Sequence, residues 1–145
     1  MRKNVKEARE VHMTKPEKGF AIDPEKPFFI FDSNGEWHAT LIQGCLWDSR
    51  GEYMGFVRGD NHDVYTVYGE WVGNLTHDGR IVRRRVVERQ PLLKIRRLRP
   101  EKPRNLPARA PLPPQHAELA HTMIDVFDWD PDVFRSVPDL KTDLS

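Results

Sequence analysis

Three short stretches of one pattern decide the fold: Gly35-Glu36-Trp37-His38-Ala39, Gly51-Glu52-Tyr53-Met54-Gly55 and Gly69-Glu70-Trp71-Val72-Gly73. Each begins with Gly-Glu, continues with an aromatic residue, and places Ala or Gly two positions after the ring. The first two follow an Asp-Ser-x turn sequence that begins at Asp32 and Asp48. Asp favours the first position of a turn, and Gly accepts the left-handed conformation that other residues resist. The pattern therefore predicts hairpin turns, each followed by a strand.

The strand after each turn alternates, so the aromatic, small and aliphatic residues of one copy share a face. In the first copy this face carries Trp37, Ala39 and Leu41. We expect the aromatic rings of the three copies to converge on a common interior, where offset packing stabilises aromatic pairs. An exposed aromatic platform that binds a ligand is the alternative. The predicted structural residues of the repeat are Trp37, Tyr53, Trp71, Gly35, Gly51 and Gly69.

A second set of glycines, Gly44, Gly59 and Gly79, lies between the copies and fits return turns. A fourth copy should follow Gly79. Its first strand is expected at 80–85, but the next residues lack the glycine and the aromatic residue. Because one hairpin alone is marginally stable, the copies must close around a shared centre. The predicted fold is all-β, with three clear hairpins and a degenerate fourth around a pseudo-symmetric centre.

These hairpins, with Asp-x-x-Gly turns followed by an aromatic residue and then Ala or Gly, resemble the bacterial domain called the 4-fold β-flower. The resemblance covers about Phe28 to Leu93. It implies four hairpins arranged about a pseudo-fourfold axis. It implies no established activity and provides no catalytic residue. The incomplete fourth copy departs from the family pattern and puts fourfold closure in question.

Length and composition predict one domain with extensions in a chain of 145 residues, of which 38% are hydrophobic and 31% charged. We divide it into a basic N-terminal extension (1–18), a β-hairpin repeat domain (19–98), a Pro-rich linker (99–114) and an acidic C-terminal helix or tail (115–145). Cys45 is the only cysteine, which suits a reducing compartment and predicts a cytoplasmic location. No stretch reads as a signal peptide or a membrane span.

The C-terminal third combines an extended segment with a short helix. Six prolines between Pro100 and Pro114 favour an extended strap or linker. A helix is expected over Gln115–Phe127, with Leu119, Met123 and Phe127 on one face. The stretch from Asp125 to Ser145 carries six aspartates against one arginine and one lysine. We expect this acidic tail to pack on the basic surface of its own or a second copy.

The basic segment from Arg80 to Arg104 holds eleven Lys and Arg residues against two glutamates. Such a strap could contact nucleic acid, an acidic protein partner or the chain's own tail. The net charge of the whole chain is only +1, which favours pairing within the protein. The predicted binding residues are Arg83, Arg84, Arg85, Arg96 and Arg97.

Histidines and aspartates in two return loops suggest a metal site. Asp60, His62, Asp63, His77 and Asp78 could meet at one rim and hold zinc, as in a metal-dependent hydrolase. Solvated turn residues are the simpler interpretation. The chain has no Gly-x-Ser-x-Gly motif and no phosphate-cradling glycine loop, so no catalytic residue and no cofactor are predicted.

The sequence therefore favours a non-enzymatic interaction or scaffold module that self-associates through its C-terminal tail. A nucleic-acid-binding module using the Arg80–Arg99 strap is the first alternative. A metal-dependent hydrolase at the His62 and His77 rim is the second. No membrane partner is expected.

Overall fold

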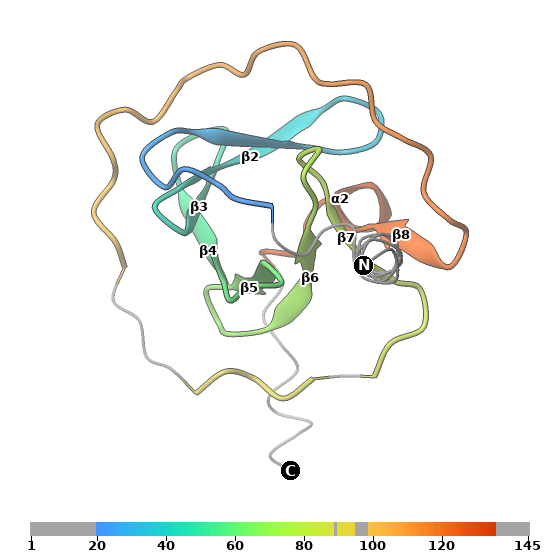
Figure 1. The fold of residues 1–145 in the computed structure, drawn as a ribbon. Coiled ribbons are helices and arrows are strands. Elements are labelled where there is room, and N and C mark those ends of the chain that lie inside the picture. The colour runs from blue at the N-terminus through green and yellow to red at the C-terminus, as the bar shows by residue number, and fades with distance from the viewer. Residues whose placement is uncertain (1–19, 89, 95–98, 136–145) are drawn as a thin grey trace, which may run out of the picture.

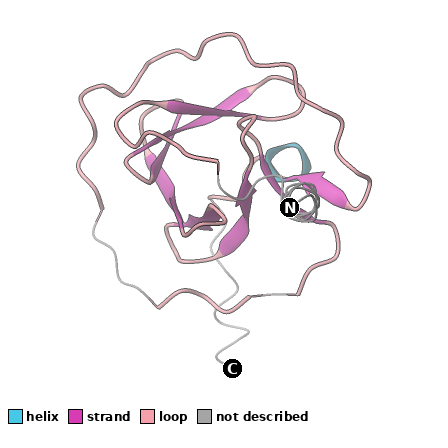
Figure 2. Cartoon of the chain, viewed as in Figure 1, coloured by secondary structure: helices cyan, strands magenta, loops and turns pink. Residues whose placement is uncertain are grey.

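A computed structural model of the chain describes residues 20–88, 90–94 and 99–135. Within those ranges the chain forms successive antiparallel hairpins and very little helix, which confirms the predicted all-β fold (Figure 2). The strands are β1 (Phe28–Phe31), β2 (Trp37–Ile42), β3 (Cys45–Asp48), β4 (Tyr53–Arg58), β5 (Asp63–Thr66), β6 (Trp71–Leu75), β7 (Ile81–Arg84) and β8 (Met123–Asp125). Helix α2 (Val126–Trp129) follows β8 directly.

The strands form one eight-stranded sheet whose spatial order follows the sequence from β1 to β8. The sheet curls into a half-barrel around an interior (Figure 1). Its two edge strands do not pair with each other, but the N–H of Phe31 at the end of β1 donates to the carbonyl of Gly79 before β7, at 2.8 Å. This contact joins β1 directly to the turn between β6 and β7.

The core is built from the inner face of the sheet and from the C-terminal segment. Phe20 and Ile22 also pack against this core, although they form no strand. The buried cluster consists of Ile30, Ala39, Leu41, Leu46, Val64, Val72, Leu75, Ile81, Val126, Phe127 and Phe134.

The predicted convergence of Trp37, Tyr53 and Trp71 on this interior is wrong. All three rings are only partly buried and lie outside the core cluster. The reason is a register shift in each hairpin, where Ile30 pairs with Ala39 but Phe31 pairs with Trp37. Such a bulge inserts one extra residue and turns two consecutive side chains to the same face. The extra residues are His38, Met54 and Val72, and they replace the rings on the inner face.

The outer face then receives the rings. Trp37 packs edge-on against Phe29 with centroids 6.1 Å apart, and Tyr53 packs against Trp47 at 5.6 Å. The small residue of the second copy, Gly55, lies against a ring from outside the repeat. A Cβ on Gly55 would meet the ring of Phe134, which comes from the C-terminal segment, at 3.0 Å.

The hairpin turns share one hydrogen-bond pattern. In the first, the N–H of Asp32 donates to the carbonyl of Glu36 at 2.9 Å, and the N–H of Gly35 donates to the carbonyl of Asp32 at 3.0 Å. The same pair of bonds recurs in the turns that begin at Asp48, Thr66 and Thr76. The fourth member is the return turn that contains Gly79, which the sequence analysis placed with Gly44 and Gly59.

Strand β8 completes the sheet from far along the chain. It pairs with β7, with Val82 opposite Asp125 and Arg84 opposite Met123. The helix predicted over Gln115–Phe127 is therefore wrong, because 123–125 are extended and α2 begins only at Val126. The second strand of the degenerate fourth hairpin does not follow β7 directly, since Val86 is 89% exposed and forms no strand. Strand β8 takes its place beside β7.

Residues 85–88, 90–94 and 99–122 lie between β7 and β8 in the chain and run along the outside of the sheet (Figure 1). We call them the outer segment. They meet successive turns: the N–H of Leu93 donates to the carbonyl of Gly69 at 3.0 Å, and the Lys102 side chain lies over Gly51. Further on, Pro113 lies over Gly35, where an added Cβ would contact its ring at 3.2 Å.

Some sequence predictions concern residues outside the described ranges. These are the extension 1–18, Arg96, Arg97 and the end of the tail from residue 136. Across the described part of the chain, no helix has the length and apolar character needed to cross a membrane.

Candidate functional site

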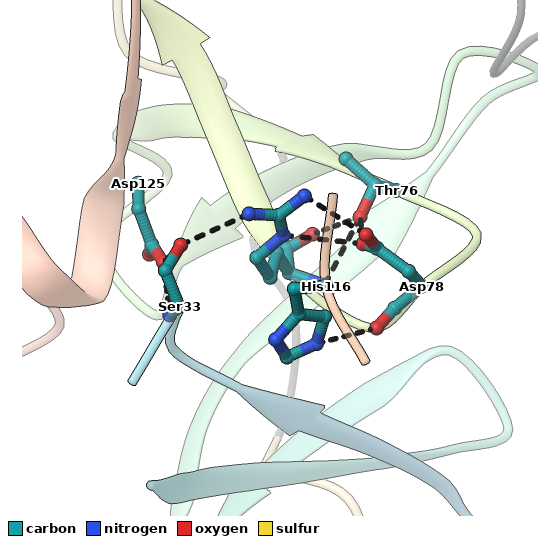
Figure 3. Close-up of polar contacts among 6 residues, drawn as sticks. Ser33, Thr76, Asp78, His116 and Asp125 are labelled. Atoms are coloured by element: carbon teal, nitrogen blue, oxygen red, sulfur yellow. Dashed lines mark hydrogen bonds and ion pairs between the residues drawn. The ribbon is translucent and has the colours of Figure 1, made fainter. Parts of the chain in front are cut away.

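A buried polar network lies where the turn after β1, the turn between β6 and β7, and the end of β8 meet (Figure 3). Its centre is Arg80, whose side chain is only 4% exposed. We call this group the Arg80 network. Its members are Ser33, Thr76, Asp78, Arg80, His116 and Asp125.

Arg80 connects two carboxylates through its guanidinium. Its Nη2 donates to Asp78 Oδ2 at 2.9 Å and its Nε to Asp78 Oδ1 at 3.3 Å. Its Nη1 donates to the Oγ of Ser33 at 3.0 Å. The hydroxyl and the N–H of Ser33 both donate to Asp125 Oδ2 at 2.6 Å. The chain of contacts thus links four segments that are distant in sequence, because His116 of the outer segment also donates to the carbonyl of Asp78 at 3.0 Å.

The ionisation of Asp78 fits this pairing. Burial is the largest influence and acts to raise its pKa, but hydrogen bonds from Arg80 and Thr76, with the positive charge of Arg80, hold the pKa below its ordinary value. Asp78 is therefore a carboxylate facing a guanidinium. Removing one partner of a buried charge pair is strongly destabilising, so this pair helps to hold together the segments that it joins.

The network lacks the serine–imidazole contact of a typical nucleophilic serine. An activated serine needs a base, most often an imidazole, within hydrogen-bond distance of its hydroxyl. The hydroxyl of Ser33 donates to Asp125, and the nearby imidazole of His116 is directed to the carbonyl of Asp78. A groove of about 520 Å³ lies beside the network. The Arg80 network holds β8 and the outer segment against the first hairpin.

A second group, Asp32, Glu36 and His38, lies in the first hairpin turn. Its ligand-type atoms all lie within 4.8 Å of one another, and within the described ranges it is the one such group of three or more His, Cys, Asp or Glu residues. His38 Nε2 is 2.9 Å from Asp32 Oδ2 and 3.9 Å from Glu36 Oε2. We call this group the turn-one trio.

The surroundings of the turn-one trio fix two of its members. Asp32 is buried, and its Oδ1 accepts the N–H of Asn34 at 2.8 Å and of Glu36 at 3.0 Å. Burial acts most strongly and raises the pKa of Asp32, but the hydrogen bonds from His38 and these two N–H groups lower it below its ordinary value overall. The imidazole of His38 stacks on Phe127. The side chain of Glu36 is 77% exposed, which leaves it room to rotate.

The predicted arginine surface is divided among different roles. Arg80 is buried in the Arg80 network, and Arg99 forms an exposed ion pair with Glu52 at 3.2 Å. Arg83 and Arg85 lie beside Trp71 along an open groove of about 690 Å³ on the flank of β7. Arg84 is exposed. We call the cavity the β7 groove; it is lined by Glu70, Trp71, Arg83, Arg85, Val87, Glu88, Gln90, Pro91 and Leu92.

The predicted histidine rim is organised around an aromatic ring. His62 stacks on Phe20 with centroids 4.2 Å apart, and His77 meets the same ring edge-on at 6.4 Å. Asp63 accepts the indole N–H of Trp71 at 3.0 Å. Among the residues with described positions, these side chains do not form a group with metal-ligand spacing.

The sequence did not predict the turn-one trio or the Arg80 network. A signal for the trio was present, because His38 occupies the repeat position that Met54 and Val72 hold in the other copies. The Ser33–Asp125 contact had no local signal, since the two residues are 92 positions apart. No protein family, curated protein or solved structure matches this chain.

Proposed function

We propose that the protein is a non-enzymatic interaction module that binds an acidic, apolar segment of a partner protein in the β7 groove. The observation that carries the proposal is the pairing of Arg83 and Arg85 with Trp71 along one open groove. Arg83 donates to the carbonyl of Arg84 and Arg85 to the carbonyl of His121, each at 2.9 Å. Each guanidinium carries five N–H donors, so both side chains keep donors for one ligand in the groove that they line. Arginine and tryptophan dominate the energetics of protein interfaces.

A protein ligand fits the groove better than a nucleic acid does. Glu70 and Glu88 line the same groove and would repel a continuous phosphate backbone. Arg80 and Arg99 of the basic run are engaged within the protein. A peptide can instead place single carboxylates against Arg83 and Arg85 and apolar side chains against Val87 and Leu92.

The finer architecture also belongs to the proposal. We infer four repeats around a pseudo-symmetric centre, as in the bacterial 4-fold β-flower, with the Pro-rich outer segment acting as a strap. The shared bonding of the three hairpin turns and the antiparallel pairing of β7 with β8 support the repeat, and the contacts of Leu93, Lys102 and Pro113 with three turn glycines support the strap. A cytoplasmic location is consistent with the single cysteine of the chain, Cys45, which is buried and forms no disulfide within the chain.

Self-association through the tail is the less favoured form of this function. Val126, Phe127 and Phe134 belong to the core of their own domain, so 126–134 are engaged in cis. A second copy could use them only by exchange. Light scattering across a range of protein concentrations separates the two forms, since exchange makes the molar mass rise with concentration.

Peptide phage display tests the groove directly. Peptides selected on the wild-type protein should share acidic and apolar residues, and Arg83→Glu should abolish their binding. Arg104→Glu, an exposed arginine of the outer segment, is the matched control and should retain binding. Selected peptides without acidic residues, or equal binding to the Arg83→Glu protein, would contradict the proposal. Tighter binding of a DNA or RNA oligomer than of any peptide would favour the nucleic-acid alternative.

A further inference from the structure

We propose that the turn-one trio, Asp32, Glu36 and His38, binds one divalent transition-metal ion, for which Zn²⁺ is the best-suited probe. One imidazole nitrogen and two carboxylates are ligands that zinc accepts, and three protein ligands leave a position for water. The three ligand atoms already converge, with His38 Nε2 2.9 Å from Asp32 Oδ2 and 3.9 Å from Glu36 Oε2.

The spacing suits an ion of this size. Metal–ligand bonds of roughly 2.0–2.2 Å place neighbouring ligand atoms roughly 3–3.5 Å apart. The His38–Asp32 pair is close to that separation already. The wider pairs, none beyond 4.8 Å, can close by rotation of the exposed Glu36 side chain. No backbone movement is needed.

Of the two fixed ligands, Asp32 has the supporting hydrogen bonds that metal sites use, and His38 is held by ring stacking. Outer hydrogen bonds that orient the ligands are as much a part of a metal site as the ligands themselves. The Oδ1 atom of Asp32 accepts two backbone N–H groups, which leaves Oδ2 directed at His38. The imidazole of His38 lies flat on Phe127, with an angle of 7° between the rings. Both ligands are thus held before any ion arrives, and only Glu36 has to be ordered.

The other copies of the repeat make the arrangement specific to the first turn. Asp48 and Glu52 reproduce the positions of Asp32 and Glu36, and the Oδ1 of Asp48 accepts the same two backbone bonds. Met54 stands where the first copy has His38. The second turn therefore keeps the structural role of the aspartate without the third ligand. The histidine is an addition that the turn itself does not require.

Calorimetric titration with Zn²⁺ after chelator treatment tests the site. The wild-type protein should bind one ion per chain, and Glu36→Gln and His38→Met should each weaken binding at least tenfold. Glu36→Gln changes an exposed side chain, and His38→Met introduces the residue of the second copy, so both proteins should fold. Glu52→Gln is the matched control and should bind as the wild type does. Bound Zn²⁺ should also raise the melting temperature of the wild type and not of His38→Met.

Several results would overturn the proposal. One is zinc binding that survives both Glu36→Gln and His38→Met. Another is binding that is lost in His62→Ala or His77→Ala instead, which would assign the ion to the histidine rim. A third is Ca²⁺ binding tighter than Zn²⁺, since a preference for calcium indicates oxygen ligands alone. Absence of any binding at millimolar zinc would dismiss the site.

Discussion

The imidazole of His38 and the ring of Phe127 stack face to face, with centroids 4.3 Å apart and an interplanar angle of 7°. The two residues come from the first bulged strand and from the last helix. The ring of Phe127 in turn packs against the ring of Phe134, with centroids 5.4 Å apart. The C-terminal segment is therefore part of the hydrophobic core, and the first prediction concerns it.

Phe127→Ala should lower the free energy of unfolding by about 3–5 kcal/mol, because it removes a fully buried ring and leaves a cavity. Urea unfolding followed by circular dichroism measures this loss. Trp129→Ala is the control from the same short helix. Its side chain is 63% exposed, so a change within about 0.5 kcal/mol is expected. Equal effects of the two substitutions would contradict the packing described here.

Arg80→Met should destabilise the fold by about 2–4 kcal/mol, because it leaves the Asp78 carboxylate unpaired in a largely buried position. Adding Asp78→Asn should recover part of the loss, since it removes the uncompensated charge. The exposed pair of Arg99 and Glu52 provides the comparison, and Arg99→Met should cost no more than about 1 kcal/mol. Chemical unfolding of the wild type and these three variants measures the effects. Equal free energies of unfolding in all four proteins would show that the Arg80 network does not stabilise the fold.

Stability should fall as the pH drops below about 4, in part through Asp78. Its folded pKa lies below the ordinary value of 3.8, so the unfolded state binds more protons in this range. The stabilisation is complete above the unfolded pKa and is lost as the pH falls through the folded one. Unfolding curves at several pH values should show a smaller acid-induced loss for Asp78→Asn than for the wild type. An equal loss in both would assign the acid sensitivity to other groups.

Gly55→Ala should destabilise the fold by about 1–3 kcal/mol through overpacking. Its Cβ would press on the carbonyl of Tyr65 and on the ring of Phe134. Combining Gly55→Ala with Phe134→Leu should relieve the contact with the ring but not the contact with the carbonyl. Thermal unfolding of the single and double variants measures the coupling. Strictly additive effects would show that the added methyl does not meet Phe134.

The parts of the fold that the sequence predicted are local ones. Turn glycines such as Gly35 and Gly51 specify their conformation within a few residues, so the hairpins and their order could be predicted. The bulge at His38 could not, because one extra residue reverses the faces of the strand without leaving a compositional mark. For that reason the aromatic rings were assigned to the wrong side of the sheet.

The long-range parts escaped prediction for a different reason. Strand β8 has only three residues, and its pairing with β7 depends on the path of the whole outer segment. The hydrogen bond between Ser33 and Asp125 depends on the same path. By contrast, Asp32 and His38 are six positions apart, and an alignment of the repeat copies with one another is enough to single out the histidine.

The late position of β8 has a consequence for biosynthesis. A ribosome releases the hairpins first, so β7 leaves the tunnel with its outer backbone edge unpaired. That edge is a template for unwanted strand addition until residues 123–125 arrive. Premature termination anywhere before Met123 would leave a nascent domain with an unpaired β7 edge and an exposed apolar core, which quality-control proteases could recognise.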